Sequence, residues 1–262
     1  MVPRSRRQTE PGPLRSACRS LVKTLIISDV HSNATALLAV LEDAGAFDRV
    51  WCLGDVVGYG PEPNECVQIL KSLPNLTCLL GNHDAAALGF IDLWTFNEEA
   101  RRAIEVQMRL LNEESRQFLD LLQPKTVQGG VTLAHGSPRD PIWEYVISAK
   151  VAERNFSAFE TQVCLIGHSH IPVIFVENGP KSTMILMPSS GDMWRSERRF
   201  ILNPGSVGQP RDRDPRAAYV VWDSEEDIWT YHRIAYDVDR VQKEILALGI
   251  PSIHAMRLAY GM

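Results

Sequence analysis

The sequence predicts an α/β fold, a four-layer α-β-β-α sandwich in which helices flank two mixed sheets, with a helical insertion. Three observations lead to this prediction. From Leu25 onward, strand-like and helix-like patterns alternate three times, which is typical of a mainly parallel sheet with right-handed crossovers. After residue 170 the strands follow closely, and short polar connections between them indicate antiparallel pairing. Between these parts, residues 85–124 have helical periodicity and form the expected insertion.

The bulk composition is that of a globular protein. The chain has 262 residues, of which 45% are hydrophobic and 23% charged, so it can bury a sizeable core. The net charge of -5 argues against an extended nucleic-acid surface but leaves room for a bound nucleotide. Apolar runs such as residues 163–167 are far shorter than the roughly 20 residues that span a bilayer. We therefore expect no membrane segment and one domain over residues 23–262, with no prediction of oligomeric state.

Residues 1–22 differ in composition from the rest. They contain five arginines, three prolines and a single acid, and they lack the apolar stretch of about 7–15 residues that marks a secretory signal. We expect a basic, flexible tail that the chemistry does not need, and a basic targeting peptide is the alternative. The five cysteines of the chain are odd in number and have no Cys-x-x-Cys spacing, so no disulfide framework is expected. This cysteine usage suits a reducing cytoplasm.

The first half of the domain is predicted as three strand–helix units followed by the insertion. The helix over 113–122 has Asn112 as a plausible N-cap, and Pro124 ends the insertion. Loops at the carboxyl ends of parallel strands are where ligands are usually bound in such sheets. The predicted elements are strand 25–29, helix 34–43, strand 49–53, helix 62–72, strand 76–80, and helices 97–111 and 113–122.

The second half begins with two strands on either side of a helical stretch. Short connections at 178–179 and 224–227 predict hairpins between the later strands. The predicted elements are strand 130–134, helix 147–159, strand 163–166, strands 173–177, 184–187, 200–202, 217–222 and 228–234, and helix 237–248.

Five polar clusters follow short apolar runs, and five of the seven histidines of the chain lie inside them. Histidines scattered without a common purpose would rarely gather in this way. In chain order the clusters are Asp29-Val30-His31, Gly54-Asp55, Leu80-Gly81-Asn82-His83-Asp84, His135-Gly136 and Gly167-His168-Ser169-His170.

These residue types suit a pair of divalent metal ions. Such a pair, about 3.5–4 Å apart, needs a shared anionic oxygen and terminal oxygen and nitrogen ligands. Asp55 is the natural bridge, since a carboxylate can offer an oxygen to both ions, and Asp29 and His31 stand two apart at a strand end. Asn82 adds a neutral oxygen. The remaining imidazoles complete a set suited to manganese, iron, zinc or nickel: His135, His168 and His170.

In this order the clusters resemble the calcineurin-like metallophosphoesterases, over roughly Leu25 to Tyr236. The small bacterial and archaeal phosphodiesterases of that superfamily also carry a run like Asn203-Pro-Gly-Ser-Val-Gly208. The resemblance implies that one metal is bound by Asp29, His31, Asp55 and His170, and the other by Asp55, Asn82, His135 and His168. Manganese is expected first, with iron, nickel or zinc as alternatives.

The resemblance also implies a reaction. Two cations would neutralise phosphate oxygens and supply a bridging hydroxide for in-line attack on phosphorus, without a covalent phosphoenzyme. His83 would face the substrate and either stabilise the developing charge or protonate the leaving oxygen.

Several nearby residues keep two interpretations. Asp84 either orients a ligand or His83, or caps the following helix. Asn203 is expected in a tight turn near the site, with substrate contact as the alternative. Arg211 is either solvated or holds a phosphate, and Tyr59 either lines the pocket or packs. His254 belongs to no cluster and is expected to be structural.

The leading functional prediction is a phosphodiesterase whose phosphoester substrate could be derived from a nucleotide. The alternatives are phosphomonoester hydrolysis, including protein phosphatase activity, and cleavage of dinucleoside polyphosphates. Residues 54–60 lack the Asp-Arg-Gly run typical of Ser/Thr phosphatases of the superfamily, and Asp84 replaces their glutamate. A non-catalytic scaffold is a further alternative, but such members tend to lose ligands that this chain keeps. We expect residues 85–124, 138–145 and 179–199 to shape the pocket.

Overall fold

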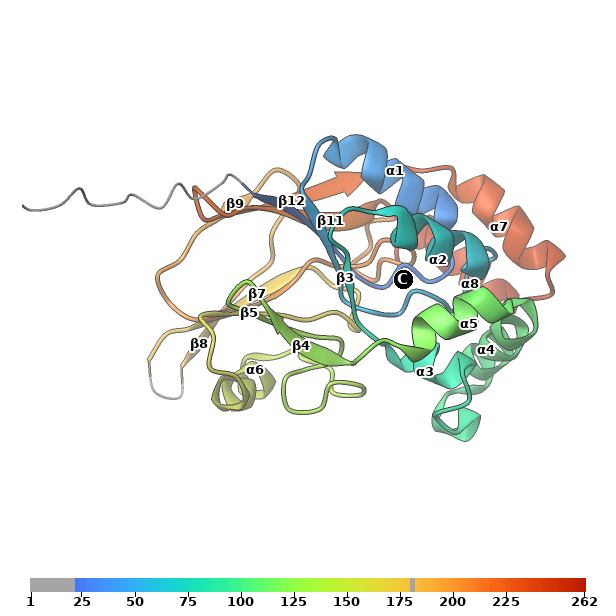
Figure 1. The fold of residues 1–262 in the computed structure, drawn as a ribbon, viewed down its shortest axis with the longest axis horizontal. Helices are drawn as coiled ribbons and strands as arrows, with labels where there is room; N and C mark the ends of the chain where they lie inside the picture. The colour runs from blue at the N-terminus through green and yellow to red at the C-terminus, as the bar shows by residue number, and fades with distance from the viewer. Residues whose placement is uncertain (1–21, 180–181) are drawn as a thin grey trace, which may run out of the picture.

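Two six-stranded sheets form the centre of the computed structural model, which describes residues 22–179 and 182–262 (Figure 1). The predicted tail therefore lies almost wholly outside the described residues. The first sheet has the order β3-β2-β1-β11-β12-β9, and the second β4-β5-β6-β10-β7-β8. Both sheets are mixed, and helices flank them. The predicted fold class is confirmed.

The first sheet begins with three parallel strands, β1 to β3, on which antiparallel strands then build. Its strands are β1 (Lys23–Ile27), β2 (Arg49–Cys52), β3 (Thr77–Cys78), β9 (Met193–Trp194), β11 (Ala217–Asp223) and β12 (Ile228–Ile234). In the second sheet, β5, β6 and β10 are parallel, and β4, β7 and β8 pair antiparallel to their neighbours. Its strands are β4 (Lys125–Gln128), β5 (Val131–Ala134), β6 (Val163–Leu165), β7 (Val173–Glu177), β8 (Thr183–Leu186) and β10 (Phe200–Asn203).

Apolar side chains from both sheets meet in one buried cluster between them. Ile26 and Trp229 come from the first sheet, and Leu133, Leu165 and Phe200 from the second. Because successive side chains of a strand point to opposite faces, the other face of each sheet is free to pack against helices. This packing holds the two sheets in a fixed relation and so fixes the loops at their ends.

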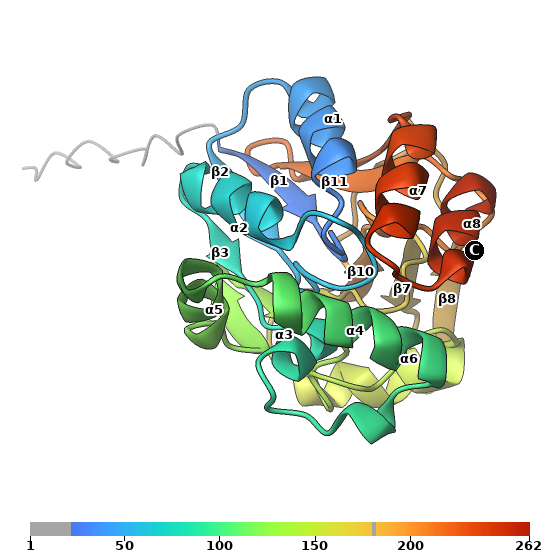
Figure 2. The same cartoon turned by 90° about the vertical axis from the view of Figure 1, so that its right-hand side faces the viewer.

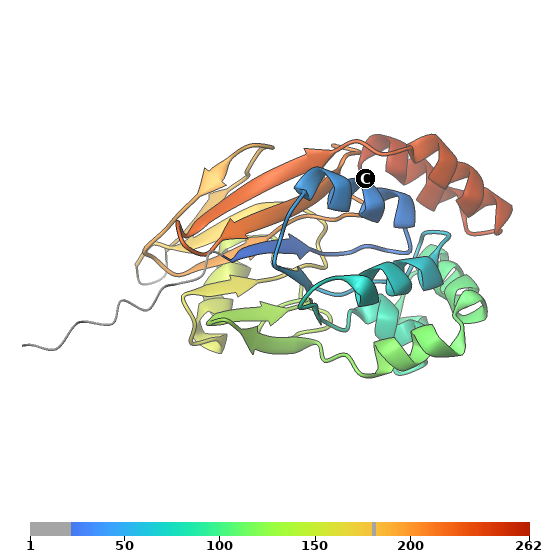
Figure 3. The same cartoon turned by 45° about the horizontal axis from the view of Figure 1, so that its top comes forward.

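Helices cover the outer faces of the sheets, as Figure 3 shows from above. On the first sheet lie α1 (Ala34–Ala44) and α2 (Pro63–Ser72), which share a core with β1 and β2. On the second lies α6 (Ala149–Asn155), followed by the 3-10 turn η2 (Phe156–Ala158), against β7 and β8.

The insertion is helical, as predicted, and it joins the two C-terminal helices in a separate apolar cluster (Figure 2). Asn97 and Asn112 cap its two longer helices, each accepting a hydrogen bond from the backbone N–H three residues on. The helices are α3 (Asn82–Ala87), η1 (Leu93–Thr95), α4 (Glu98–Leu110), α5 (Glu113–Asp120), α7 (Val238–Ala247) and α8 (Ser252–Tyr260).

Five elements were not predicted: α3, η1, β4, β9 and α8. The first is a six-residue helix that begins inside a polar cluster, and β9 has two residues, so neither has a readable period. The predicted strand over 76–80 is shorter, because beyond β3 only a bridge joins Leu79 to Gln123. Within the part of the chain that the structure describes, no helix has the length and apolarity needed to cross a bilayer.

The described cysteines are free, in agreement with the predicted lack of a disulfide framework. They are Cys52, Cys66, Cys78 and Cys164, and Cys18 lies outside the described residues.

Candidate metal centre

All five polar clusters follow the carboxyl ends of parallel strands. Those after β1, β2 and β3 belong to the first sheet, and those after β5 and β6 to the second. Because the two sheets pack face to face, ligands from opposite sheets converge at one edge of the sandwich. The structure brings the seven predicted ligands into two overlapping groups.

The first group consists of Asp29, His31, Asp55 and His170, whose ligand atoms all lie within 4.8 Å of one another. The Nε2 atom of His170 lies 3.3 Å from Oδ1 of Asp29, and 3.0 Å from Nε2 of His31. All four side chains are buried. A single cation could therefore contact two carboxylates and two imidazoles here.

The second group consists of Asp55, His135 and His168, again with ligand atoms within 4.8 Å of one another. Asn82 joins it, since its Oδ1 atom lies 3.0 Å from Nε2 of His135. The other ring nitrogen of His135 lies 2.9 Å from the carbonyl oxygen of Leu53. This group has fewer carboxylates than the first, and Asp55 is common to both.

Asp55 is oriented so that one oxygen faces both groups. Its Oδ1 atom accepts a hydrogen bond of 2.9 Å from the backbone N–H of His83. Its Oδ2 atom lies 3.6 Å from Nε2 of His31 and 3.5 Å from Nε2 of His135, and it is buried without a hydrogen-bond partner. A buried carboxylate oxygen that lacks a donor is costly, and contact with a cation would remove that cost.

The tautomers of two histidines also indicate that this group could bind a cation. Nδ1 of His31 lies 3.1 Å from the carbonyl oxygen of Val57, and Nδ1 of His170 lies 2.6 Å from that of Gln209. A carbonyl oxygen only accepts, so each Nδ1 carries the hydrogen and each neutral ring presents an Nε2 lone pair. These lone pairs face each other at 3.0 Å. A cation between them turns this repulsion into coordination, so the residues present fit a metal ion.

The backbone at the ligands is in an uncommon conformation. Five of the seven candidate ligands have positive φ angles between 49° and 64°, in the left-handed region that few non-glycine residues adopt. Strain of this kind gathers at functional sites, where the surrounding structure holds it in place. The five residues are Asp29, His31, Asp55, His168 and His170.

Burial dominates the electrostatics of the cluster. It raises the pKa of the Asp29 carboxyl to about 7, and it raises that of Asp55 well above the usual value, with Asp84 adding to the shift. Burial also lowers the pKa values of His31, His168 and His170 well below the usual range. The surroundings thus keep the imidazoles neutral, as metal ligation requires.

Gly81 shows how closely the strand ends approach each other. A Cβ atom at this position would lie 2.0 Å from Oδ1 of Asp55 and 2.3 Å from its backbone nitrogen. Only glycine fits there, because no rearrangement of a flexible side chain could relieve a contact with the Asp55 backbone. The absence of a side chain at Gly81 therefore lets Asp55 lie where the other ligand candidates can reach it.

A cavity of about 410 Å³ opens beside the ligands and is lined by both Asn82 and His83. The Nδ1 atom of His83 is buried and has no hydrogen-bond partner. Burial lowers the pKa of His83 well below the usual range, and the positive charge of Arg211 lowers it further. The other lining residues come from the insertion and from loops around it: Tyr59, Thr95, Phe96, Asn97, Ala100, Trp143, Tyr145, Arg211, Arg257 and Met262.

Asp84 and Asn203 have structural contacts. The two carboxylate oxygens of Asp84 accept hydrogen bonds of 2.9 Å from the backbone N–H groups of Val57 and Gly81, so Asp84 caps helix α3, and no hydrogen bond joins it to the His83 ring. Asn203 is buried and donates 2.7 Å and 3.1 Å hydrogen bonds to the carbonyl of Gly167 and the hydroxyl of Ser169. It holds the loop that carries His168 and His170, and its own Oδ1 closes the expected turn.

Arg211 and Tyr59 both line the cavity. The Arg211 guanidinium lies 5.7 Å from the centre of the Tyr59 ring and donates to the side-chain oxygen of Gln209. Tyr59 in turn contacts His83 and His254, at ring-centre distances of 4.4 Å and 4.5 Å. His254, which was expected to be structural, hydrogen-bonds through Nε2 to the carbonyl of Glu99 and packs against the Tyr59 ring.

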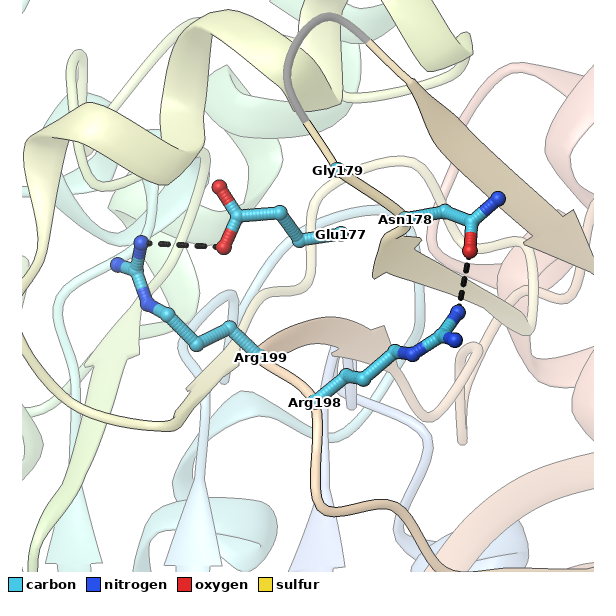
Figure 4. Close-up of a pocket in the computed structure, with 5 residues that line it drawn as sticks. All are labelled: Glu177, Asn178, Gly179, Arg198 and Arg199. Carbon is cyan, nitrogen blue, oxygen red and sulfur yellow. Dashed lines mark hydrogen bonds and ion pairs between the residues drawn. The ribbon is translucent and has the colours of Figure 1, made fainter.

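Arg257 was not predicted as a site residue, because it lies on the unpredicted helix α8. The insertion and the loop over 138–145 line the cavity as expected. Among the described residues of 179–199, none does. Gly179, Arg198 and Arg199 border instead a separate hollow of about 620 Å³ at the turn after β7. There Arg199 forms an ion pair with Glu177, and Arg198 hydrogen-bonds to Asn178 (Figure 4). None of the candidate metal ligands lines that hollow.

Comparison with known proteins places the chain in a family. The model of the calcineurin-like phosphoesterase superfamily domain matches residues 22–227. The crystal structure of a metallophosphoesterase from Sphaerobacter thermophilus superposes with a TM-score of 0.86 at 41% identity, covering 93% of this chain and 100% of that one. An uncharacterized protein of Methanocaldococcus jannaschii is 35% identical over 92% of this chain and all of its own length.

A more distant relative has a named activity. The symmetrical bis(5'-nucleosyl)-tetraphosphatase of Pseudomonas putida is 30% identical over 130 residues, which make up 46% of this chain and 43% of that protein. The match thus spans less than half of either chain.

Proposed function

This chain belongs to the calcineurin-like phosphoesterase superfamily, and we propose on that premise that it is a dinuclear metal-dependent phosphodiesterase. The observation that carries the proposal is the position of Asp55, whose unpartnered Oδ2 atom faces the imidazoles of both ligand groups. We assign one cation to Asp29, His31, Asp55 and His170, and the other to Asp55, Asn82, His135 and His168. Manganese is the expected metal, with iron, nickel or zinc as alternatives.

When bound, the two cations would neutralise phosphate oxygens and lower the pKa of the attacking water. The chain itself supplies the orientation. Asp55 is fixed by the His83 backbone, and the ring of His83 lines the cavity in which a phosphoester would lie. A neutral imidazole there can donate a hydrogen bond to the leaving oxygen or to a phosphate oxygen. Arg211, in the same cavity, offers a second donor to the phosphate.

Preference for a diester is supported by two features of the sequence. The run over 203–208 is like that of small phosphodiesterases, and residues 54–60 lack the arginine that grips phosphate in protein phosphatases of the superfamily. The aromatic rings of Phe96 and Trp143 also line the cavity. A cytoplasmic setting is part of the proposal, supported by the free cysteines of the described chain.

Cleavage of dinucleoside polyphosphates is the second candidate, because the Pseudomonas relative, of which 43% is matched, is named a bis(5'-nucleosyl)-tetraphosphatase. The same metal centre would serve both reactions, since each needs a water delivered in line to phosphorus. The substrates differ in the group that leaves, which is an alcohol in a diester and a phosphate in a polyphosphate.

The proposal is tested with metal-stripped protein to which manganese, nickel, zinc or magnesium is returned. An aryl phosphodiester, the matching aryl phosphomonoester and diadenosine tetraphosphate are the substrates. Diester turnover that returns with manganese or nickel supports the proposal. Preference for the monoester or for the tetraphosphate promotes the corresponding alternative. No turnover of any substrate with two metals bound contradicts a hydrolase and favours a scaffold.

A further inference from the structure

The cavity beside His83 has an aromatic wall that the metal centre does not require. The Phe96 ring lies 5.2 Å from that of His83 and 5.2 Å from that of Trp143, centre to centre. Phe96 comes from the insertion, and Trp143 from the loop after β5. Trp143 is 36% exposed, and Phe96 is half-buried because it also packs against the core, so part of each ring is left to line the cavity. A planar group bound in the cavity would find both rings beside it.

Two arginines also line the cavity, at different distances from the metal ligands. The backbone N–H of Arg211 donates a 3.3 Å hydrogen bond to the carbonyl of His170, and its side chain lines the cavity together with His83, so it belongs to the region of the reacting phosphate. Arg257 comes from α8 and stands beside the insertion residues. Among the described residues, no acidic side chain lines the cavity and neither arginine has an ion-pair partner. The Arg257 guanidinium therefore lines the cavity without an ion-pair partner.

The size of the cavity limits what can fill it. At about 410 Å³ it lies near the lower end of the range of small-molecule sites, which runs from roughly 300 to 1,000 Å³. That is room for one nucleoside-sized group, not for a length of nucleic acid. Aromatic rings beside an unpaired arginine are the usual way in which proteins hold a nucleobase together with a phosphate.

We infer that this cavity is a specificity subsite for a nucleotide that carries a second anionic group. In this assignment, which rests on the proposed function, Phe96 and Trp143 hold the base and Arg257 holds the second phosphate. The ester to be cleaved lies between His83, Arg211 and the metal centre. Such a ligand could be the end of a nucleic acid, with its extra phosphate on the 3' oxygen, or a nucleoside polyphosphate, with its extra phosphate in the chain.

Calorimetric binding to the manganese-loaded protein tests the base contact without relying on turnover. Ribose 5-phosphate and AMP differ only in the base, and phosphate release is followed in the same samples so that only intact ligand is counted. We expect AMP to bind at least about tenfold more tightly, as stacking on aromatic side chains gives. In Trp143→Ala and Phe96→Leu the ratio of the AMP affinity to the ribose 5-phosphate affinity should fall toward one, while the affinity for ribose 5-phosphate stays unchanged. Trp94→Ala is the matched control, because Trp94 is 78% exposed and does not line the cavity.

The second phosphate is tested with ADP and adenosine 3',5'-bisphosphate, which place it in the two alternative positions. At least one of them should bind more tightly than AMP, by about fivefold or more, as expected for an arginine–phosphate contact. Arg257→Gln should abolish that gain and leave AMP binding unchanged. Arg257→Lys should retain part of the gain in affinity. Arg109→Gln changes an exposed residue outside the cavity and should retain all of that gain.

The outcomes separate this inference from the proposed function. Equal binding of AMP and ribose 5-phosphate, or equal losses for both in Trp143→Ala and Phe96→Leu, would overturn the base subsite. A gain from the second phosphate that survives Arg257→Gln would overturn the role of Arg257. Turnover of an aryl diester in the same preparation would show that the proposed function stands although the subsite inference has failed.

Discussion

The Nε2 atoms of His31 and His170 lie 3.0 Å apart although each ring already donates its Nδ1 hydrogen to a backbone carbonyl. Two buried lone pairs at this distance repel each other, and the fold holds them there with residues in left-handed backbone conformations. A cation bound between them would explain the arrangement, and it would also satisfy the buried Oδ2 atom of Asp55, which has no hydrogen-bond partner.

Asp55→Asn should disrupt both metal positions, because an amide offers one neutral oxygen where a carboxylate bridges two cations. We expect manganese content after dialysis to fall from two ions to one or none, and kcat/KM for an aryl diester to fall by about 10³-fold or more. Asp120→Asn, at an exposed position of α5, is the control and should keep both ions. Full metal content in Asp55→Asn would show that the carboxylate is not shared.

His83→Ala should separate catalysis from metal binding. His83 lines the cavity but belongs to neither ligand group, so metal content should stay at two ions. We expect kcat to fall by roughly 10²–10⁴-fold, the usual contribution of a positioned proton donor. Metal analysis alongside steady-state kinetics checks both statements. Loss of metal together with activity would instead make His83 a ligand or a support of Asp55.

Gly81→Ala should damage the fold at the metal centre. The added Cβ would lie 2.0 Å from Oδ1 of Asp55, so the strand ends must separate. Overpacking typically costs about 1–3 kcal/mol of unfolding free energy, and here the backbone contact places the expected loss at the upper end. Urea denaturation measures it. Gly89→Ala serves as the comparison, since a Cβ there meets nothing within 4 Å and only its positive φ is unfavourable. Equal losses in the two variants would contradict the steric account.

Metal binding should release protons near neutral pH. Burial raises the pKa of Asp29 to about 7 in the metal-free protein, so at pH 6 this carboxyl is mostly protonated and must ionise to bind a cation. Because the pKa values of His31 and His170 are lowered, these rings are already neutral and release nothing. Affinity for manganese should therefore rise with pH through about 7. Calorimetry in buffers of different ionisation enthalpy measures the release, and proton uptake at pH 6 would refute the prediction.

The sequence predicted the strands that carry the ligands because each is a short apolar run that ends in a polar cluster. That pattern is local, and so are the caps at Asn97 and Asn112. The role of Asp84 could not be predicted in the same way. Its two interpretations differ only in whether the carboxylate hydrogen-bonds to the His83 ring or to the backbone N–H groups of Val57 and Gly81. The choice depends on the relation of two strand ends, which no local pattern contains.

The wall of the cavity was the least predictable part of the site. Phe96, Trp143 and Arg257 come from three segments that no periodicity links, and they meet only because the insertion and α8 pack together. The prediction that residues 179–199 shape the pocket was wrong for the part of this range that the structure describes, since none of those residues lines the cavity. Ligands at strand ends are placed by the sheet, whereas substrate contacts are placed by the packing of helices and loops.

Anomalous diffraction from crystals of the manganese-loaded protein would show whether two cations share Asp55. We expect two peaks about 3.5–4 Å apart, one among Asp29, His31 and His170 and one among Asn82, His135 and His168, with Asp55 between them. A single peak, or peaks away from these residues, would contradict this expectation.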